Sequence, residues 1–98
     1  MFTVLTTQAF EEWLDGIADG RTRRRLATRL RKAELGNLGD VKSVGDGVME
    51  MREHFGPGWR MYYVTRDATI ILMLGGGDKD DQSRDIAAAK RFAETLED

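Results

Sequence analysis

The sequence contains no cysteine and only one histidine, His54. The absence of cysteine excludes disulfide bonds and thiolate metal sites, and a zinc cluster is not expected because such sites need several cysteine or histidine ligands. No serine lies in the strand–turn–helix setting of a hydrolase nucleophile. We therefore expect neither a metal nor an organic cofactor.

Long apolar runs and a basic N-terminal leader are also missing. No apolar stretch approaches the ~20 residues that cross a bilayer, and no basic residues precede an apolar segment at Met1-Phe2-Thr3-Val4-Leu5. The 98 residues, of which 41% are hydrophobic and 33% charged, suit one globular unit. The sequence predicts a single soluble, cytoplasmic domain over residues 1–98.

The net charge of −2 argues against a general nucleic-acid binder, but this average includes a strongly basic segment. Between positions 21 and 32 there is no acidic residue, and the cations are Arg21, Arg23, Arg24, Arg25, Arg29, Arg31 and Lys32. Such a run can be the solvated face of a helix, or it can bind an acidic or phosphate-rich partner. Charge alone leaves both interpretations open.

The first part of the chain predicts one strand and two helices. Residues 2–5 are apolar and partly β-branched, which favours a strand. Thr6 and Thr7 can cap a first helix, which Gly20 is expected to end, and a second helix is expected over residues 22–34. The apolar positions recur at helical spacing and predict a helical hairpin with one shared core surface: Phe10, Trp13, Leu14, Ile17, Leu26, Leu30 and Ala33.

From position 40 onward the hydrophobic period changes from helical to alternating, which predicts strands. They are expected over residues 41–45, 48–55, 59–66 and 69–74, and Gly75-Gly76-Gly77 is expected to end the last one. A final helix is expected from Asp81 to about Leu96. The order β-α-α-β-β-β-β-α predicts an α+β fold, in which an N-terminal helical hairpin and a C-terminal helix pack on an antiparallel sheet.

Polar side chains on neighbouring strands are the candidates for chemistry. The hairpin about Gly56-Pro57-Gly58 brings its two strands together, so polar groups meet if the alternation places them on one face. The start of the final helix follows the neighbouring apolar strand and adds further groups. The candidates are Arg52, His54, Arg60, Tyr62, Lys79, Gln82 and Asp85.

These groups suit cleavage of RNA through its 2′-hydroxyl. That reaction needs removal of a proton, stabilisation of charge on phosphorus and a proton for the departing 5′-oxygen. Arginine and lysine stabilise such charge, and the acid and base candidates are Lys79, Tyr62, His54 and Asp85. Spacing alone also allows a structural interpretation, in which Arg52 and Arg60 pair with Glu50 and Glu53 on a solvated sheet face.

Three segments of the sequence resemble a known family: GNLGD (residues 36–40), GVMEMREHFGPGWRMYY (residues 47–63) and LMLGGGDKDDQSRDIAAA (residues 72–89). They are similar to the HigB-like branch of the RelE/ParE toxin superfamily, whose members are often called addiction-module killer proteins. The likeness extends from about Phe10 to Phe92. The combination of E-x-R, GPG-x-R-x-Y and GGDK-x-x-Q-x-x-D-I is more specific than any one of these pieces.

The resemblance implies a RelE-like fold and a metal-independent, ribosome-dependent endoribonuclease, an mRNA interferase that inhibits translation. It also implies a cognate helix-turn-helix antitoxin as partner, with operator DNA bound only through that antitoxin. The matching positions imply that Arg52 and Arg60 bind phosphate and transition-state charge and that Lys79 binds phosphate or transfers a proton. Tyr62 is a further catalytic candidate, and Gln82 and Asp85 support the site.

On this interpretation the basic segment between positions 21 and 32 binds RNA or the ribosome. Two alternatives remain open at the level of sequence. One is a non-enzymatic inhibitor of DNA gyrase, as in the ParE branch, and the other is a non-toxic remnant that only binds an antitoxin.

Overall fold

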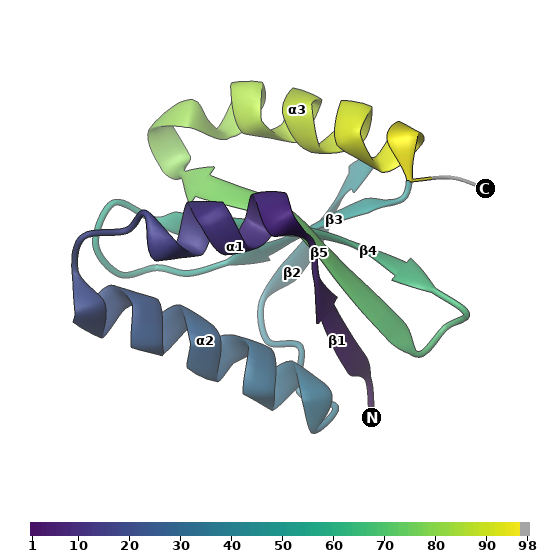
Figure 1. The fold of residues 1–98 in the computed structure, drawn as a ribbon, viewed down its shortest axis with the longest axis horizontal. Coiled ribbons are helices and arrows are strands. Elements are labelled where there is room, and N and C mark those ends of the chain that lie inside the picture. Colours follow the sequence, from purple (N-terminus) through teal and green to yellow (C-terminus); the bar gives the residue numbers. More distant parts are fainter. Residues whose placement is uncertain (97–98) are drawn as a thin grey trace.

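A five-stranded sheet divides the molecule into two hydrophobic layers, with α1 and α2 on one face and α3 on the other (Figure 1). The structure is a computed structural model that describes residues 1–96, so residues 97–98 of the predicted domain lie outside the described part. The elements are β1 (Thr3–Thr6), α1 (Gln8–Asp15), α2 (Gly20–Glu34), β2 (Val41–Gly45), β3 (Val48–Arg52), β4 (Trp59–Arg66), β5 (Ile70–Asp78), a 3₁₀ turn (Lys79–Asp81) and α3 (Gln82–Thr95). The predicted element order is confirmed.

The sheet has the strand order β1-β5-β4-β3-β2 and is mixed rather than antiparallel. The three pairs among β2, β3, β4 and β5 are antiparallel, as predicted, but β1 runs parallel to β5, with Thr3 opposite Ile70 and Thr6 opposite Met73. The prediction of a purely antiparallel sheet is therefore wrong. Alternation within a strand fixes which face is buried, but it carries no information on which edge receives a strand that is distant in sequence.

The larger core lies between the sheet and the helical hairpin. Phe10 of α1 and Leu26 and Ala33 of α2 are fully buried there, against Met51, Met61, Tyr63, Ile71 and Met73 of the sheet. The predicted shared core surface of the two helices is confirmed. Alternate residues of the same strands, Val48, Tyr62 and Leu74, face the opposite way and pack beneath α3, as the period of two requires.

Two predicted breaks fall in the wrong place. Gly20 begins α2 rather than ending α1, because the side chain of Asp19 accepts a hydrogen bond from the backbone N–H of Arg21 (3.2 Å) and caps the second helix. The three consecutive glycines do not end β5, which continues to Asp78. They lie inside the sheet, opposite Tyr62, Met61 and Arg60 of β4.

The glycines are required there by close contacts on both faces of the strand. A Cβ atom on Gly76 would lie 2.5 Å from the Trp13 ring of α1, and one on Gly77 would lie 1.9 Å from the Asp85 carboxylate of α3. Glycine in a strand often marks such a close approach rather than its end. It is this approach that brings α3 down onto the sheet beside the polar residues described below.

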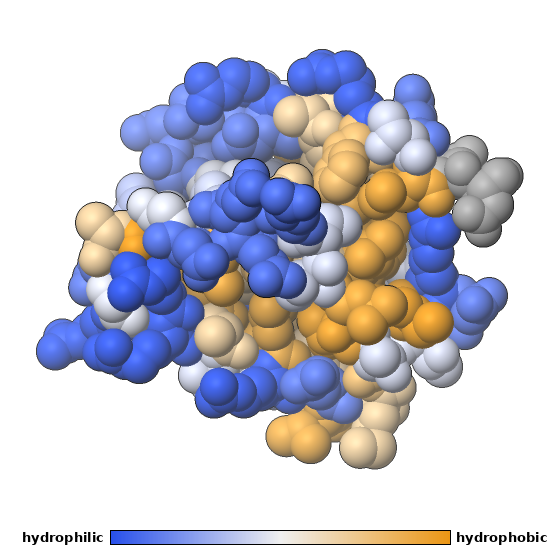
Figure 2. Space-filling model, viewed as in Figure 1, coloured by the Kyte–Doolittle hydropathy of each residue, from blue (hydrophilic) through white to orange (hydrophobic). Residues whose placement is uncertain are grey.

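Apolar side chains remain visible at the surface between α3 and β1 (Figure 2). Leu5 of β1 is 48% exposed. Over α2 the surface is hydrophilic in the same view. No helix within residues 1–96 has the length and apolar character needed to cross a membrane.

Thr7 joins α1 to the sheet and is a sensitive point of the fold. Its hydroxyl accepts a hydrogen bond from the backbone N–H of Phe10 (3.2 Å) and donates one to the carbonyl of Met73 (2.9 Å). Replacement by alanine removes both bonds and is expected to lower the free energy of unfolding by about 1–2 kcal/mol, measured by urea denaturation. Thr7→Ser keeps the hydroxyl and should retain most of that stability; an equal loss in the serine variant would assign the effect to the methyl group instead.

Candidate functional site

A tight hairpin between β3 and β4 places two arginines opposite one another. Gly56 (φ 57°) and Gly58 (φ 80°) adopt left-handed conformations that favour glycine, which lets the chain reverse within a few residues. Arg52 is the register partner of Arg60. Directly opposed residues of an antiparallel pair share a face, so the prediction that these two arginines lie on one side of the sheet is confirmed.

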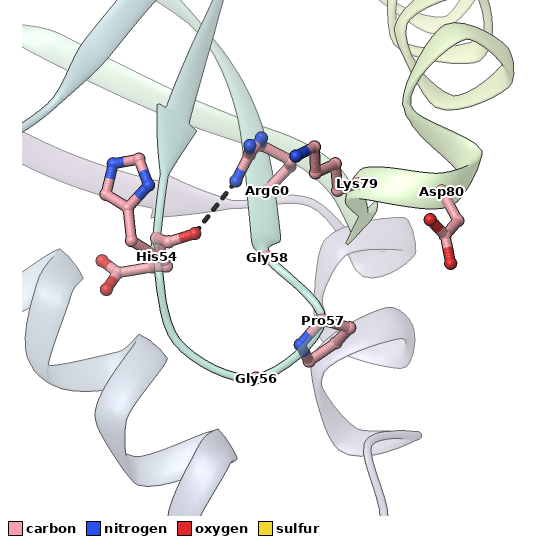
Figure 3. A pocket seen from close by; sticks show the side chains of 8 residues that line it. His54, Gly56, Pro57, Gly58, Arg60, Lys79 and Asp80 are labelled. Atoms are coloured by element: carbon pink, nitrogen blue, oxygen red, sulfur yellow. Dashed lines mark hydrogen bonds between the residues drawn. The ribbon is translucent and has the colours of Figure 1, made fainter.

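Beside this hairpin lies an open hollow of about 330 Å³, walled by the hairpin on one side and by the 3₁₀ turn that follows β5 on the other. Arg60 and Lys79 meet there (Figure 3): a point at the Cβ position of Gly58 lies 3.6 Å from Nη1 of Arg60 and 3.7 Å from Cδ of Lys79. The Arg60 Nη1 donates to the backbone carbonyls of Glu53 (3.0 Å) and Trp59 (3.1 Å). These bonds hold one edge of a cation that is only 7% exposed.

His54 also lines the hollow, at the start of the hairpin, but its imidazole is turned away from Arg60 and Lys79 (Figure 3). Its Nε2 lies 2.7 Å from Oδ2 of Asp40, whose other oxygen accepts from Nη2 of Arg52 at 3.2 Å. Hydrogen bonds from His54 and then from Arg52 lower the pKa of Asp40, so its carboxylate stays charged and orients both partners. Arg52 therefore faces Asp40 and is not part of the hollow's lining.

Tyr62 lies away from the hollow. Its side chain is on the same face as Arg60 but is 1% exposed beneath α3. Burial is the main cause that raises its pKa, and the charges of Glu50 and Asp85 act in the same direction. The structure thus separates Tyr62 from any substrate in the hollow.

Glu50 forms the centre of a buried polar cluster on this face. It is 0% exposed, stands opposite Tyr62 in the register, and accepts a hydrogen bond of 2.7 Å from Nε2 of Gln82. Asp85 approaches the sheet over Gly77, and burial raises the pKa of its carboxyl group. The interpretation of a solvated sheet face is therefore wrong, because α3 covers it.

The predicted partners of Glu53 are also different. Its carboxylate pairs with Arg29 of α2, whose guanidinium in addition donates to the carbonyls of Leu38, Asp40 and Arg52. Arg29 is thus committed to holding α2 on the hairpin. Arg23 is turned toward the carbonyls of Ile17 and Ala18, with a bond of 3.2 Å to the latter.

The remaining cations of the basic segment are exposed on α2: Arg21, Arg24, Arg25, Arg31 and Lys32. Arg25 covers the ring of Phe55 in the hairpin, with 3.8 Å between its Cζ atom and the ring centroid. The basic face of α2 is therefore attached to the same hairpin that walls the hollow. Within residues 1–96 no group of three or more histidine, cysteine, aspartate or glutamate side chains is placed to hold a metal ion.

Comparison with known proteins identifies a family. No protein-family model matches the sequence. An uncharacterized protein of Haemophilus influenzae is 37% identical over 93 residues, which make up 95% of this chain and 94% of that protein. The chain belongs to the family of this protein. The relative is uncharacterized, so the chemistry of the hollow is inferred from its residues.

A solved structure shares the fold beyond this family. The solution structure of a conserved hypothetical protein of Helicobacter pylori matches with a TM-score of 0.53, covering 82% of this chain and 97% of that one, at 17% sequence identity. At this identity the match shows the fold alone.

The sequence does not single out two features of the site. His54 is only one of several acid–base candidates and is not among the positions that match the family, yet it lines the hollow with Arg60 and Lys79. Glu50 was considered only as a surface partner. One signal for its burial was available in the sequence. Glu50 lies at the centre of an alternating strand, and both faces of such a strand are covered when helices pack on both sides of the sheet.

Proposed function

We propose that this protein is the toxin of a type II toxin–antitoxin pair and cleaves messenger RNA on the ribosome. The observation that carries the proposal is the convergence of Arg60 and Lys79 on one open hollow, with His54 on its rim. Two cations that line one hollow suit a phosphodiester group, whose charge increases as phosphorus becomes five-coordinate. The resemblance of the surrounding segments to the HigB-like branch of the RelE/ParE superfamily supports the same activity.

The chemistry assigns a separate task to each residue of the hollow. The 2′-oxygen of the RNA loses its proton and bonds to phosphorus, the bond to the 5′-oxygen breaks, and the 5′-oxygen takes up a proton. Arg60 and Lys79 stabilise the charge on the phosphoryl oxygens. His54 is held by Asp40 at 2.7 Å on the edge of the hollow and is the candidate for proton exchange.

The ribosome supplies what the small hollow lacks. An open surface site orients a flexible RNA poorly, and alignment of the 2′-oxygen with the bond that breaks contributes a large part of the rate. The exposed cations of α2 are the docking surface for ribosomal RNA in this proposal. A cognate helix-turn-helix antitoxin neutralises the toxin, and the chain reaches operator DNA only through that antitoxin.

Induced expression in a bacterial host tests the proposal. We expect growth to stop with methionine incorporation falling at once, while thymidine incorporation continues, and we expect Lys79→Ala to reduce the killing at least tenfold. Lys42→Ala, which removes an exposed lysine of β2, is the matched control and should kill normally. Continued translation with arrested DNA synthesis would instead indicate a gyrase inhibitor, and harmless expression of the wild type would indicate a non-toxic remnant.

A further inference from the structure

The carboxylate of Glu50 is buried with incomplete hydrogen bonding. Oε2 accepts from Gln82, whereas Oε1 has no partner at hydrogen-bond distance and lies 4.0 Å from Nε of Arg60. That separation is about 1 Å too long for a hydrogen bond. The Arg60 Nε and the neighbouring Tyr62 hydroxyl are likewise buried without a hydrogen-bond partner among the described residues. Glu50 and Arg60 therefore attract each other through charge alone, in an environment where water screens them little.

Such an arrangement is a poor way to stabilise a fold. Removing a carboxylate from water costs free energy that an ion pair recovers only with close geometry and satisfied lone pairs. Apolar side chains in place of both partners would avoid that cost, as Val48 and Leu74 do elsewhere on this face. The carboxylate is better explained by what it does to its partners.

Both cations of the hollow are connected to this one carboxylate. Arg60 is attracted to it directly. Lys79 is connected through the backbone, because Gln82, which donates to Glu50, is the first residue of α3 and immediately follows the 3₁₀ turn that carries Lys79. Movement of either partner away from Glu50 would change the spacing of the two cations.

We propose that Glu50 is a positioning residue, which holds the Arg60 guanidinium and the Lys79 turn at the spacing that a phosphodiester group requires. This inference rests on the proposed function. An effect of charge and an effect of positioning predict opposite results for Glu50→Gln. The substitution removes a negative charge beside the hollow, so simple attraction would bind RNA at least as tightly, whereas loss of position weakens charge stabilisation in the transition state.

The test is cleavage of mRNA on programmed ribosomes by the full chain. For Glu50→Gln we expect kcat to fall about ten- to thirtyfold with KM within about twofold of the wild type. Gln82→Met, which removes the 2.7 Å bond, should lower kcat in the same way. Asp46→Asn makes the same change in net charge at an exposed residue paired with Lys90 and should leave both constants unchanged.

A second readout is independent of RNA. In the folded wild type the Nε–H of Arg60 should exchange slowly with solvent, as followed by nuclear magnetic resonance, and in Glu50→Gln the exchange should be at least tenfold faster. Unchanged exchange, unchanged kcat, or a rise in KM with kcat preserved would each overturn the inference. If the wild type cuts no RNA, the proposed function fails, whereas the exchange rate still decides whether Glu50 holds Arg60.

Discussion

Replacement of Arg60 by lysine is expected to lower kcat for mRNA cleavage by about a hundredfold or more. The guanidinium uses Nη1 to donate to two carbonyls at 3.0 and 3.1 Å, and its planar fork still presents other N–H groups to a phosphate. A lysine ammonium is a compact point charge on a flexible stem and cannot satisfy both carbonyls and a phosphoryl oxygen from one fixed position. The measurement is cleavage on programmed ribosomes under saturating conditions.

Arg66→Lys is the matched control, because it lies on the same strand and also donates to a backbone carbonyl, that of Leu96 at 3.0 Å. It lies far along β4 from the hollow and should cleave at the wild-type rate. Both variants should remain folded, as judged by circular dichroism and urea denaturation. Normal cleavage by Arg60→Lys would remove Arg60 from the reaction and with it the main argument for the site.

Gly76→Ala is expected to lower the free energy of unfolding by about 2–3 kcal/mol, the upper part of the range for an overfilled core. The new methyl group would lie 2.5–2.6 Å from three carbons of the Trp13 ring. That ring is confined by Phe10 and by Trp59, whose centroids lie 5.7 and 6.2 Å from its own. For a domain of this size the melting temperature should fall by roughly 10 °C or more, which calorimetry measures.

The adjacent glycine offers a control within the same strand. A Cβ atom on Gly75 meets no other atom within 4 Å, so Gly75→Ala should change stability by less than about 0.5 kcal/mol. Equal losses for the two variants would show that the strand tolerates no side chain for conformational reasons. The contact with Trp13 would then not be the cause.

The sequence predicts the local features of this fold well and the pairing of distant segments poorly. The caps, turns and periods are local, and they placed β4 at Trp59–Arg66 and β2 at Val41–Gly45 without error. The pairing of β1 with β5 joins segments 67 positions apart, as Thr3 and Ile70 show, and no local pattern encodes it. Gly75-Gly76-Gly77 gave a wrong strand end, because the sequence does not distinguish a glycine that allows a helix to approach the sheet from one that ends a strand.

The candidate site shows the same division. The opposition of Arg52 and Arg60 follows from the hairpin and could be predicted, since a short turn fixes the register. The approach of Arg60 to Glu50 could also be considered from the sequence, because both residues lie in the hairpin. The pairing of Arg52 with Asp40 could not, because Asp40 lies outside the hairpin, just before β2. The burial of Tyr62 depends on where α3 crosses the sheet, which the alternation along β4 does not specify.

The parallel pairing of β1 with β5 has a consequence for biosynthesis. The N-terminal strand leaves the ribosome early, but its partner and the turn that carries Lys79 are made only after residue 69. The cluster around Glu50 and Arg60 is likewise incomplete until Gln82 has been synthesised. Joining ends so far apart carries an entropic cost that local helix and hairpin formation does not. A nascent chain is thus unable to complete the polar cluster around Glu50 until residue 82 has emerged from the ribosome.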